Sequence, residues 1–160
     1  MVLVNRVENG YHLRVGETKT TWSERALAEL RSSGYRRGFA RARVIDFLDR
    51  QGCCVGAQEI HRKLRELGEP IGLASVYRVL DVLAEKRLVQ RLDLGDGVTR
   101  FEPVRDAEDH HHHIVCDDCG KIDAFADERL ESVMRDVEQS SGYAVAGHDI
   151  VLRGACGACR

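Results

Sequence analysis

The sequence predicts an α+β protein in two parts, a helical N-terminal part that ends in a hairpin and a small C-terminal α/β part. Three observations predict it. Helical apolar spacing dominates from residue 22 to residue 86, strand-like runs follow, and the charge changes sign along the chain. Residues 1–105 hold 19 Lys and Arg against 14 Asp and Glu, whereas residues 106–160 hold 5 against 12. A basic part joined to an acidic part indicates two domains with different partners.

The basic part has the spacing of helices followed by a hairpin. A helical pattern starts at Trp22, with Ser23 as its N-cap, and stops at Gly34. Three further helical segments each place apolar residues on one face: Ala40–Arg50, Ala57–Leu67 and Ala74–Lys86. Two strand-like runs, Leu88–Leu94 and Val98–Glu102, flank an Asp-Gly turn that is typical of hairpins. Three helices and a hairpin are the order of a winged helix-turn-helix, although a generic soluble domain could share that order.

The acidic part predicts a small α/β unit. Its first two strands are expected at His113–Val115 and Ile122–Phe125, and a helix at Asp127–Ser140 follows. A closing pair of strands is expected at Gly142–Val145 and Asp149–Arg153. A few strands and one helix bury little apolar surface, so we expect this unit to need a metal ion and a second subunit.

Two Cys-x-x-Cys pairs in the acidic part predict a zinc site. Cys116 and Cys119 follow a predicted strand, and Cys156 and Cys159 lie close to the end of the sequence. Four thiolates around a tetrahedral Zn²⁺ form a closed structural site, and glycines beside each pair allow the sharp turns that aim two sulfurs at one ion. The alternatives are two unrelated reduced pairs or one redox-active pair, but a redox motif would need a βαβ context.

Four consecutive histidines stand just before the first cysteine pair. In an extended segment His110 and His112 face one side, and His111 and His113 face the other, so one strand can serve two metal sites. Candidates for the remaining ligands are His148, Glu131, Cys54 and Glu102. A site that draws on both parts of the chain would couple metal occupancy to the angle between them. An engineered tag and a solvated polar turn are the alternatives.

The basic part offers a surface for a polyanion. Five arginines fall within thirteen residues that contain no acid, namely Arg31, Arg36, Arg37, Arg41 and Arg43. The first turn of the Ala74–Lys86 helix offers Ser75, Tyr77 and Arg78 opposite its apolar stripe, where the second helix of a helix-turn-helix enters the major groove. An ordinary solvated helix surface, and a packing role for Tyr77, are the alternatives.

Three stretches together resemble the ferric-uptake-regulator (Fur) family of bacterial metalloregulators, over roughly residues 32–160. They are Gly72–Leu80, His110–Lys121, and Gly147-His148 with the terminal cysteine pair. The resemblance implies a winged-helix domain, a dimerisation domain, and a homodimer that binds an inverted-repeat operator in double-stranded DNA when it is loaded with metal. It also implies repression of genes for metal uptake or stress.

The resemblance assigns ligand roles to three sets of residues. The structural zinc site matches Cys116, Cys119, Cys156 and Cys159. The regulatory hinge site matches His111 and His113, completed here by Cys54 and Glu102, with Asp106, Glu108 or Asp109 as substitutes for Glu102. A further site in the dimerisation domain matches His110, His112, Glu131 and His148. Many members have His at the Cys54 position, and a thiol there favours Zn²⁺ over Fe²⁺ as the regulatory ion.

We therefore expect a metal-dependent, DNA-binding repressor of metal-homeostasis genes, with a structural Zn²⁺ and a regulatory Zn²⁺ or Fe²⁺. The expected domains are a flexible extension at 1–21, a winged-helix domain at 22–104, a hinge at 105–109 and a metal-binding dimerisation domain at 110–160. A peroxide- or manganese-responsive regulator of the same family is one alternative. A metal storage or delivery protein, which would not need Arg78, is another.

Other classes of protein are not expected. No run of 18 apolar residues spans a membrane, and the N-terminus lacks the apolar stretch of a signal peptide, so a cytoplasmic location is expected. A zinc deaminase needs His-x-Glu, then Pro before its Cys-x-x-Cys, and an open coordination position. Neither cysteine pair follows a proline. We therefore expect no enzyme and no small-molecule substrate.

Overall fold

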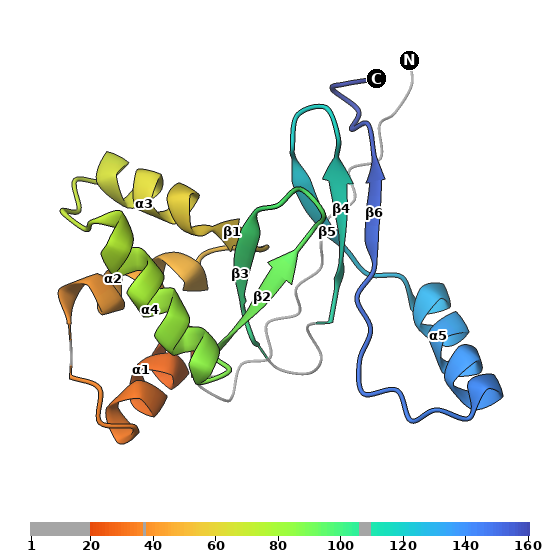
Figure 1. The fold of residues 1–160 in the computed structure, drawn as a ribbon, viewed down its shortest axis with the longest axis horizontal. Helices are drawn as coiled ribbons and strands as arrows, with labels where there is room; N and C mark the ends of the chain where they lie inside the picture. Colours follow the sequence, from red (N-terminus) through yellow and green to blue (C-terminus); the bar gives the residue numbers. More distant parts are fainter. Residues whose placement is uncertain (1–19, 37, 106–109) are drawn as a thin grey trace, which may run out of the picture.

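The computed structural model describes residues 20–36, 38–105 and 110–160, and it has an α+β fold in which two groups of elements lie side by side (Figure 1). The first group consists of α1 (Trp22–Ser32), α2 (Phe39–Asp49), β1 (Val55–Gly56), α3 (Ala57–Glu66), α4 (Leu73–Glu85), β2 (Val89–Asp93) and β3 (Thr99–Pro103). The second group consists of β4 (His112–Cys116), β5 (Ile122–Phe125), α5 (Glu128–Ser141) and β6 (Val151–Gly154). The α+β fold with a helix-turn-helix first is thereby confirmed. In the described part of the chain we find no helix with the length and apolar character of a bilayer span.

Helix α1 begins two residues earlier than a cap at Ser23 would allow. The N-cap is Thr21 and not Ser23, because the Thr21 hydroxyl accepts a hydrogen bond from the backbone N–H of Glu24. The Glu24 carboxylate in turn accepts from the backbone N–H of Thr21 at 2.9 Å, which completes a capping box. The helix is tied to the hairpin by the Trp22 indole, which donates to the carbonyl oxygen of Leu88 at 3.0 Å.

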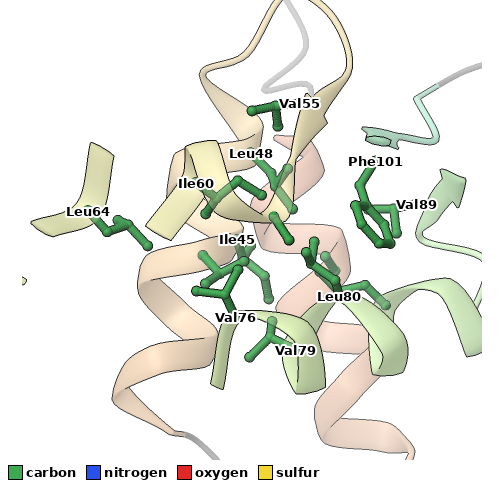
Figure 2. Packing of buried hydrophobic residues seen from close by; sticks show 14 of the residues in the cluster. Ile45, Leu48, Val55, Ile60, Leu64, Val76, Val79, Leu80, Val89 and Phe101 are labelled. Atoms are coloured by element: carbon green, nitrogen blue, oxygen red, sulfur yellow. The ribbon is translucent and has the colours of Figure 1, made fainter. Parts of the chain in front are cut away.

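The main hydrophobic core lies among the helices of the first group. Its largest buried side chains come from all four helices, and Figure 2 shows Ile45, Leu48, Ile60, Val76 and Leu80 packed against one another. Each of these five side chains is completely shielded from solvent. The core thereby fixes α4 against α2 and α3, and it leaves the opposite face of α4 exposed.

Two three-stranded sheets complete the fold. In the first sheet the order is β1-β3-β2, and both pairings are antiparallel, with Val55 opposite Phe101 and Arg91 opposite Phe101. The short strand β1 was not predicted, because two residues are too few for a periodic pattern. In the second sheet the order is β5-β4-β6, and β6 runs parallel to β4.

The predicted strand at Gly142–Val145 is wrong. Gly142 has a φ of 73°, a left-handed conformation that favours glycine, and it caps the C-terminus of α5. The backbone N–H of Val145 donates to the side chain of Glu138 in α5, so its donor is used by the helix and not by a strand. The closing element is therefore β6 alone, which pairs with β4 and not with residues 142–145.

A second, smaller apolar cluster joins the two groups. Cys54 and Leu94 from the first group and Val115 from β4 are all buried in it. Helix α5, in contrast, contributes no buried residue in the single chain, although the structure describes every residue of it. Its Val133 and Val137 are each 51% exposed, so α5 presents an apolar stripe to solvent.

Candidate metal centres

The four cysteines of the two Cys-x-x-Cys pairs come together at one end of the second sheet. Cys116 ends β4, Cys119 follows in the tight turn, and Cys156 and Cys159 lie in the turn after β6. Their sulfur atoms all lie within 4.8 Å of one another, and Cys119 Sγ is 3.8 Å from Cys156 Sγ. The parallel pairing of β4 and β6 produces this meeting, because it places the ends of both strands at the same edge of the sheet.

The electrostatics of this cluster suit a cation. The backbone N–H of Cys156 donates to Cys116 Sγ at 3.2 Å, and backbone hydrogen bonds from Cys156 and Cys119 lower the pKa of the Cys116 thiol to about 6. Hydrogen bonds with the neighbouring sulfurs, that of Cys156 first, raise the pKa of Cys159 to about 12. Four sulfurs this close cannot all ionise without a positive charge between them, and tetrahedral Zn²⁺ is the ion that four thiolates suit. The donor set therefore fits a structural zinc ion.

A second cluster lies where the two groups of elements meet. His111 precedes β4 and His113 lies within it, while Glu102 comes from β3 of the first group. His111 Nε2 is 3.0 Å from Glu102 Oε1, and His113 Nε2 is 3.7 Å from the same oxygen. Gln90 donates to the other oxygen of Glu102 at 3.0 Å. Burial raises the pKa of Glu102, but the nearby His113 side chain and the hydrogen bond from Gln90 outweigh this effect and lower the pKa, so the carboxylate stays ionised.

Sequence reasoning missed one member of this cluster, Cys53. The structure brings Cys53, Cys54 and His113 together as a separate triad within 4.8 Å, whereas only Cys54 was expected there. The two sulfur atoms lie 3.9 Å apart. The available signal was the adjacent cysteine pair itself, at the entrance to β1. The proposed substitutes for Glu102 at positions 106, 108 and 109 lie outside the described residues.

Proton positions in this triad reflect the shared contacts. The neighbouring Cys54 thiol lowers the pKa of Cys53 to about 5, and the same contact raises the pKa of Cys54. Interactions with the Cys53 side chain first, and then with the Glu102 carboxylate, raise the pKa of His113 to about 9. His113 Nε2 is buried without a hydrogen-bond partner among the described residues. A buried nitrogen of this kind, surrounded by sulfur and carboxylate donors, fits a metal ligand.

A third cluster gathers on the other side of the histidine run. His112 is 1% exposed, and its Nε2 lies 2.8 Å from Glu131 Oε1 on α5. His110 Nε2 is 3.3 Å from His148 Nε2, and His148 Nε2 is 3.4 Å from Glu131 Oε2. The hydrogen bond with His112 is the main cause that lowers the pKa of Glu131. Three imidazoles and a carboxylate that converge in this way fit a first-row divalent cation.

A cleft of about 890 Å³ gives access to the second and third clusters. It is lined from the first group by residues such as Cys53 and Glu102, and from the second by His110, His111 and His148. Both clusters are thus open to ions from solvent, and the second cluster takes its donors from both walls of the cleft.

The structure exposes some of the residues that were expected to face DNA, but not all of them. Arg78 and Tyr77 are exposed on α4, and Ser75 on the same helix is half-buried. Arg41 is engaged within the protein, because it donates to the carbonyl oxygen of Arg36 and stacks 5.2 Å from the ring centre of Tyr35. The side chain of Arg36 is exposed, and Arg37 lies outside the described residues.

Comparison with known proteins places the chain in one class, that of metal-dependent regulators. The sequence model of the Ferric uptake regulator family matches residues 32–153. The chain is 34% identical over 134 residues to a ferric uptake regulation protein of Yersinia pestis, a match that covers 82% of this chain and 89% of the relative. It is 32% identical over 138 residues to the corresponding protein of Bacillus subtilis, with 85% and 93% covered. The chain therefore belongs to the ferric uptake regulator family, whose members are transcriptional regulators.

Two solved structures agree with this assignment. The ferric uptake regulator of Vibrio cholerae has a TM-score of 0.72 and 32% identity, with 81% of this chain and 98% of that chain covered. That structure reveals a rearrangement of the DNA-binding domains of the Vibrio cholerae protein. The Helicobacter pylori regulator has a TM-score of 0.76 and 28% identity, with 89% and 94% covered, and is described as having three functional metal binding sites.

Proposed function

We propose that this protein is a homodimeric, metal-dependent repressor that binds an inverted-repeat DNA operator and controls metal-uptake genes, with zinc favoured over iron as the signal. The observation that supports it most is the origin of the donors around His113. Glu102, Cys53 and Cys54 belong to the helical group, whereas His111 and His113 belong to the segment that leads into the second sheet. An ion bound there joins the two groups and favours one angle between them.

The mechanism is a population shift. The ion has more ligands when the two groups are closed together than when they are apart, so it binds the closed arrangement better and raises its population. If the closed dimer sets two α4 helices about one helical turn of DNA apart, metal occupancy raises operator affinity by the same coupling free energy. Within each subunit, Arg78 and Tyr77 of α4 are proposed to reach base edges, and Arg36 to contact phosphate.

The proposed domains follow from these separate roles in DNA binding and metal binding. Residues 22–104 bind DNA, residues 105–109 act as the hinge, and residues 110–160 bind metal and form the dimer. The exposed apolar stripe of α5 supports dimerisation, because one three-stranded sheet with an uncovered helix buries too little surface alone. The four-cysteine site holds structural zinc, and the Glu131 cluster is a further metal site. Residues 1–21 are proposed to be an extension.

The preference for zinc rests on sulfur. Imidazole and carboxylate donors readily bind Fe²⁺ and Mn²⁺, whereas added thiolates shift a mononuclear site toward Zn²⁺. The similar proteins of Yersinia pestis and Bacillus subtilis are named for iron uptake, and this makes iron the competing signal for this chain. The adjacent thiols of Cys53 and Cys54 are the observation that favours zinc here.

The test is a gel-shift titration with an operator that the zinc-loaded protein selects from random duplex DNA. Removal of the cleft metal with a mild chelator, while the four-cysteine zinc is retained, should lower operator affinity about tenfold or more, within the range of allosteric couplings. Arg78→Ala should lose operator binding and keep its metal content. Undiminished binding after chelation would remove the sensing role, and undiminished binding by Arg78→Ala would favour a metal storage or delivery protein.

A further inference from the structure

The adjacent thiols at the entrance to β1 form a donor set of their own. Cys53 Sγ and Cys54 Sγ lie 3.9 Å apart, and His113 completes a triad whose donor atoms lie within 4.8 Å of one another. Cys54 is buried and Cys53 is half-buried at the wall of the cleft. The triad is therefore accessible to a small cation and shielded on its inner side.

A second triad in the same place has a different chemical character. Glu102 and His111 also converge on His113, and they offer one oxygen and one nitrogen in place of two sulfurs. The two triads thus share a single imidazole. A neutral imidazole has one nitrogen that can accept a metal, because the other carries a proton, so His113 can serve only one ion at a time.

We propose that Cys53, Cys54 and His113 form a site for thiophilic cations such as Zn²⁺, Cd²⁺ or Cu⁺, which competes for His113 with the Glu102–His111–His113 set. Soft thiolates select these cations, whereas carboxylate and imidazole donors accept Fe²⁺ and Mn²⁺. The hinge therefore holds one ion and chooses its ligands by the chemistry of that ion. This inference rests on the proposed regulatory role of the hinge, and it adds Cys53 as the residue that determines metal selectivity.

Both triads join the two groups of elements, but through different parts of the helical group. An ion bound by the two sulfurs links His113 to the residues just before β1, whereas an ion bound by Glu102 links His113 to β3. Because β1 leads directly into α3, an ion bound by the sulfur set restrains the position of the first helix of the helix-turn-helix. An ion bound by the Glu102–His111–His113 set restrains β3 of the hairpin instead.

Cobalt is a suitable probe, because Co²⁺ bound by thiolate gives a sulfur-to-metal charge-transfer absorption in the near ultraviolet. The experiment titrates Co²⁺ into full-length protein that retains zinc in its four-cysteine site, and it monitors the zinc content throughout. We expect the absorption in wild type, about half of it in Cys53→Ser, and none in Cys53→Ser/Cys54→Ser. Glu102→Gln is the matched control and should keep the full absorption.

A competition assay gives a second readout. The affinity for Zn²⁺ relative to Mn²⁺ should fall about tenfold or more in Cys53→Ser, since even changes outside the ligand shell cost that much. The same ratio should rise in Glu102→Gln. No charge-transfer absorption in wild type, or an absorption that survives in the double variant while zinc is retained, would overturn the proposal.

The outcome separates this inference from the proposed function. If the absorption is absent but zinc still raises operator affinity, the sulfur site is wrong and the repressor stands. If the absorption behaves as expected but operator affinity ignores every metal, the sulfur site stands and the repressor is wrong.

Discussion

Neighbouring residues of one type have different environments in the histidine run. His112 is shielded from solvent and faces α5, whereas His111 beside it faces β3 of the other group. The strand alternation of side chains produces this difference, because successive residues point to opposite sides of the backbone. A single-residue insertion before β4 would therefore exchange the partners of every histidine in the run.

Cys156 makes a residue-scale prediction about the structural zinc. Cys156→Ser removes one of the four sulfurs and the donor set that the two turns share, so the purified protein should lose about one zinc ion per chain. It should also elute as a monomer, because the turns at the ends of β4 and β6 are no longer clipped together. Zinc analysis and size-exclusion chromatography measure both effects.

The control for this prediction is Cys53→Ser, which also removes a thiol but lies outside the four-cysteine cluster. It should retain the tightly held zinc and the dimer. If Cys156→Ser keeps its full zinc content, or stays dimeric without zinc, the four-cysteine cluster is not what holds the second sheet together.

At the scale of elements, the capping box of α1 distinguishes the structure from the sequence-based expectation. Thr21→Ala removes the side-chain acceptor of the Glu24 N–H and should lower the free energy of unfolding by about 1 kcal/mol. Ser23→Ala should cost much less, because among the described residues the side chain of Ser23 forms a hydrogen bond only with the Thr21 hydroxyl. Denaturant titrations of both variants decide the matter, and a larger loss for Ser23→Ala would restore Ser23 as the cap.

Elements with strong local periodicity could be predicted from the sequence, and those fixed by distant contacts could not. Helices α3 and α4 fall where their apolar spacing places them, because the core selects one face of each helix. The two-residue strand β1 exists only because β3 pairs with it, and no local pattern signals that pairing. The segment after Gly142 looks extended in sequence, yet its backbone donor at Val145 is taken by Glu138 of α5.

The candidate site divides in the same way. The residue types and the two-sided histidine run could be foreseen, because both follow from ligand chemistry and strand alternation. The parallel pairing of β4 with β6 could not be foreseen, since it joins residues about 38 positions apart through a helix and another strand. Cys53 was missed for a related reason. Its approach to His113 depends on how the two groups pack, which no local spacing in the sequence encodes.

At the scale of the whole molecule, the two groups meet through a small interface that one arginine spans. Arg153 on β6 forms an ion pair with Asp117, at the turn of the first cysteine pair, with N and O 2.6 Å apart. The same guanidinium donates to the carbonyl oxygen of Leu94, at the tip of the β2–β3 hairpin. Leu94 is itself buried against Val115 of β4. The arginine thus ties the hairpin to the end of the chain that holds the structural cysteines.

This tie predicts that Arg153 supports metal binding at a distance from the ligands. The hinge ion and Arg153 favour the same closed arrangement of the two groups, so loss of one contact makes the other weaker. Arg153→Met should weaken binding of the hinge ion by about two- to fivefold. The effect is modest because the guanidinium is partly exposed, and such ion pairs contribute up to about 1 kcal/mol. Calorimetric titration of protein that retains its structural zinc measures the affinity.

The matched control is Arg129→Met, which removes an ion pair of the same length with Asp127. That pair lies at the start of α5 and makes no contact with the helical group among the interactions of the described residues. Loss of the Arg129–Asp127 pair should leave the affinity for the hinge ion unchanged. Equal affinities for Arg153→Met and Arg129→Met would mean that the hairpin contact does not help to close the hinge, and that the hinge ion and the Cys54–Leu94–Val115 cluster set the closed arrangement by themselves.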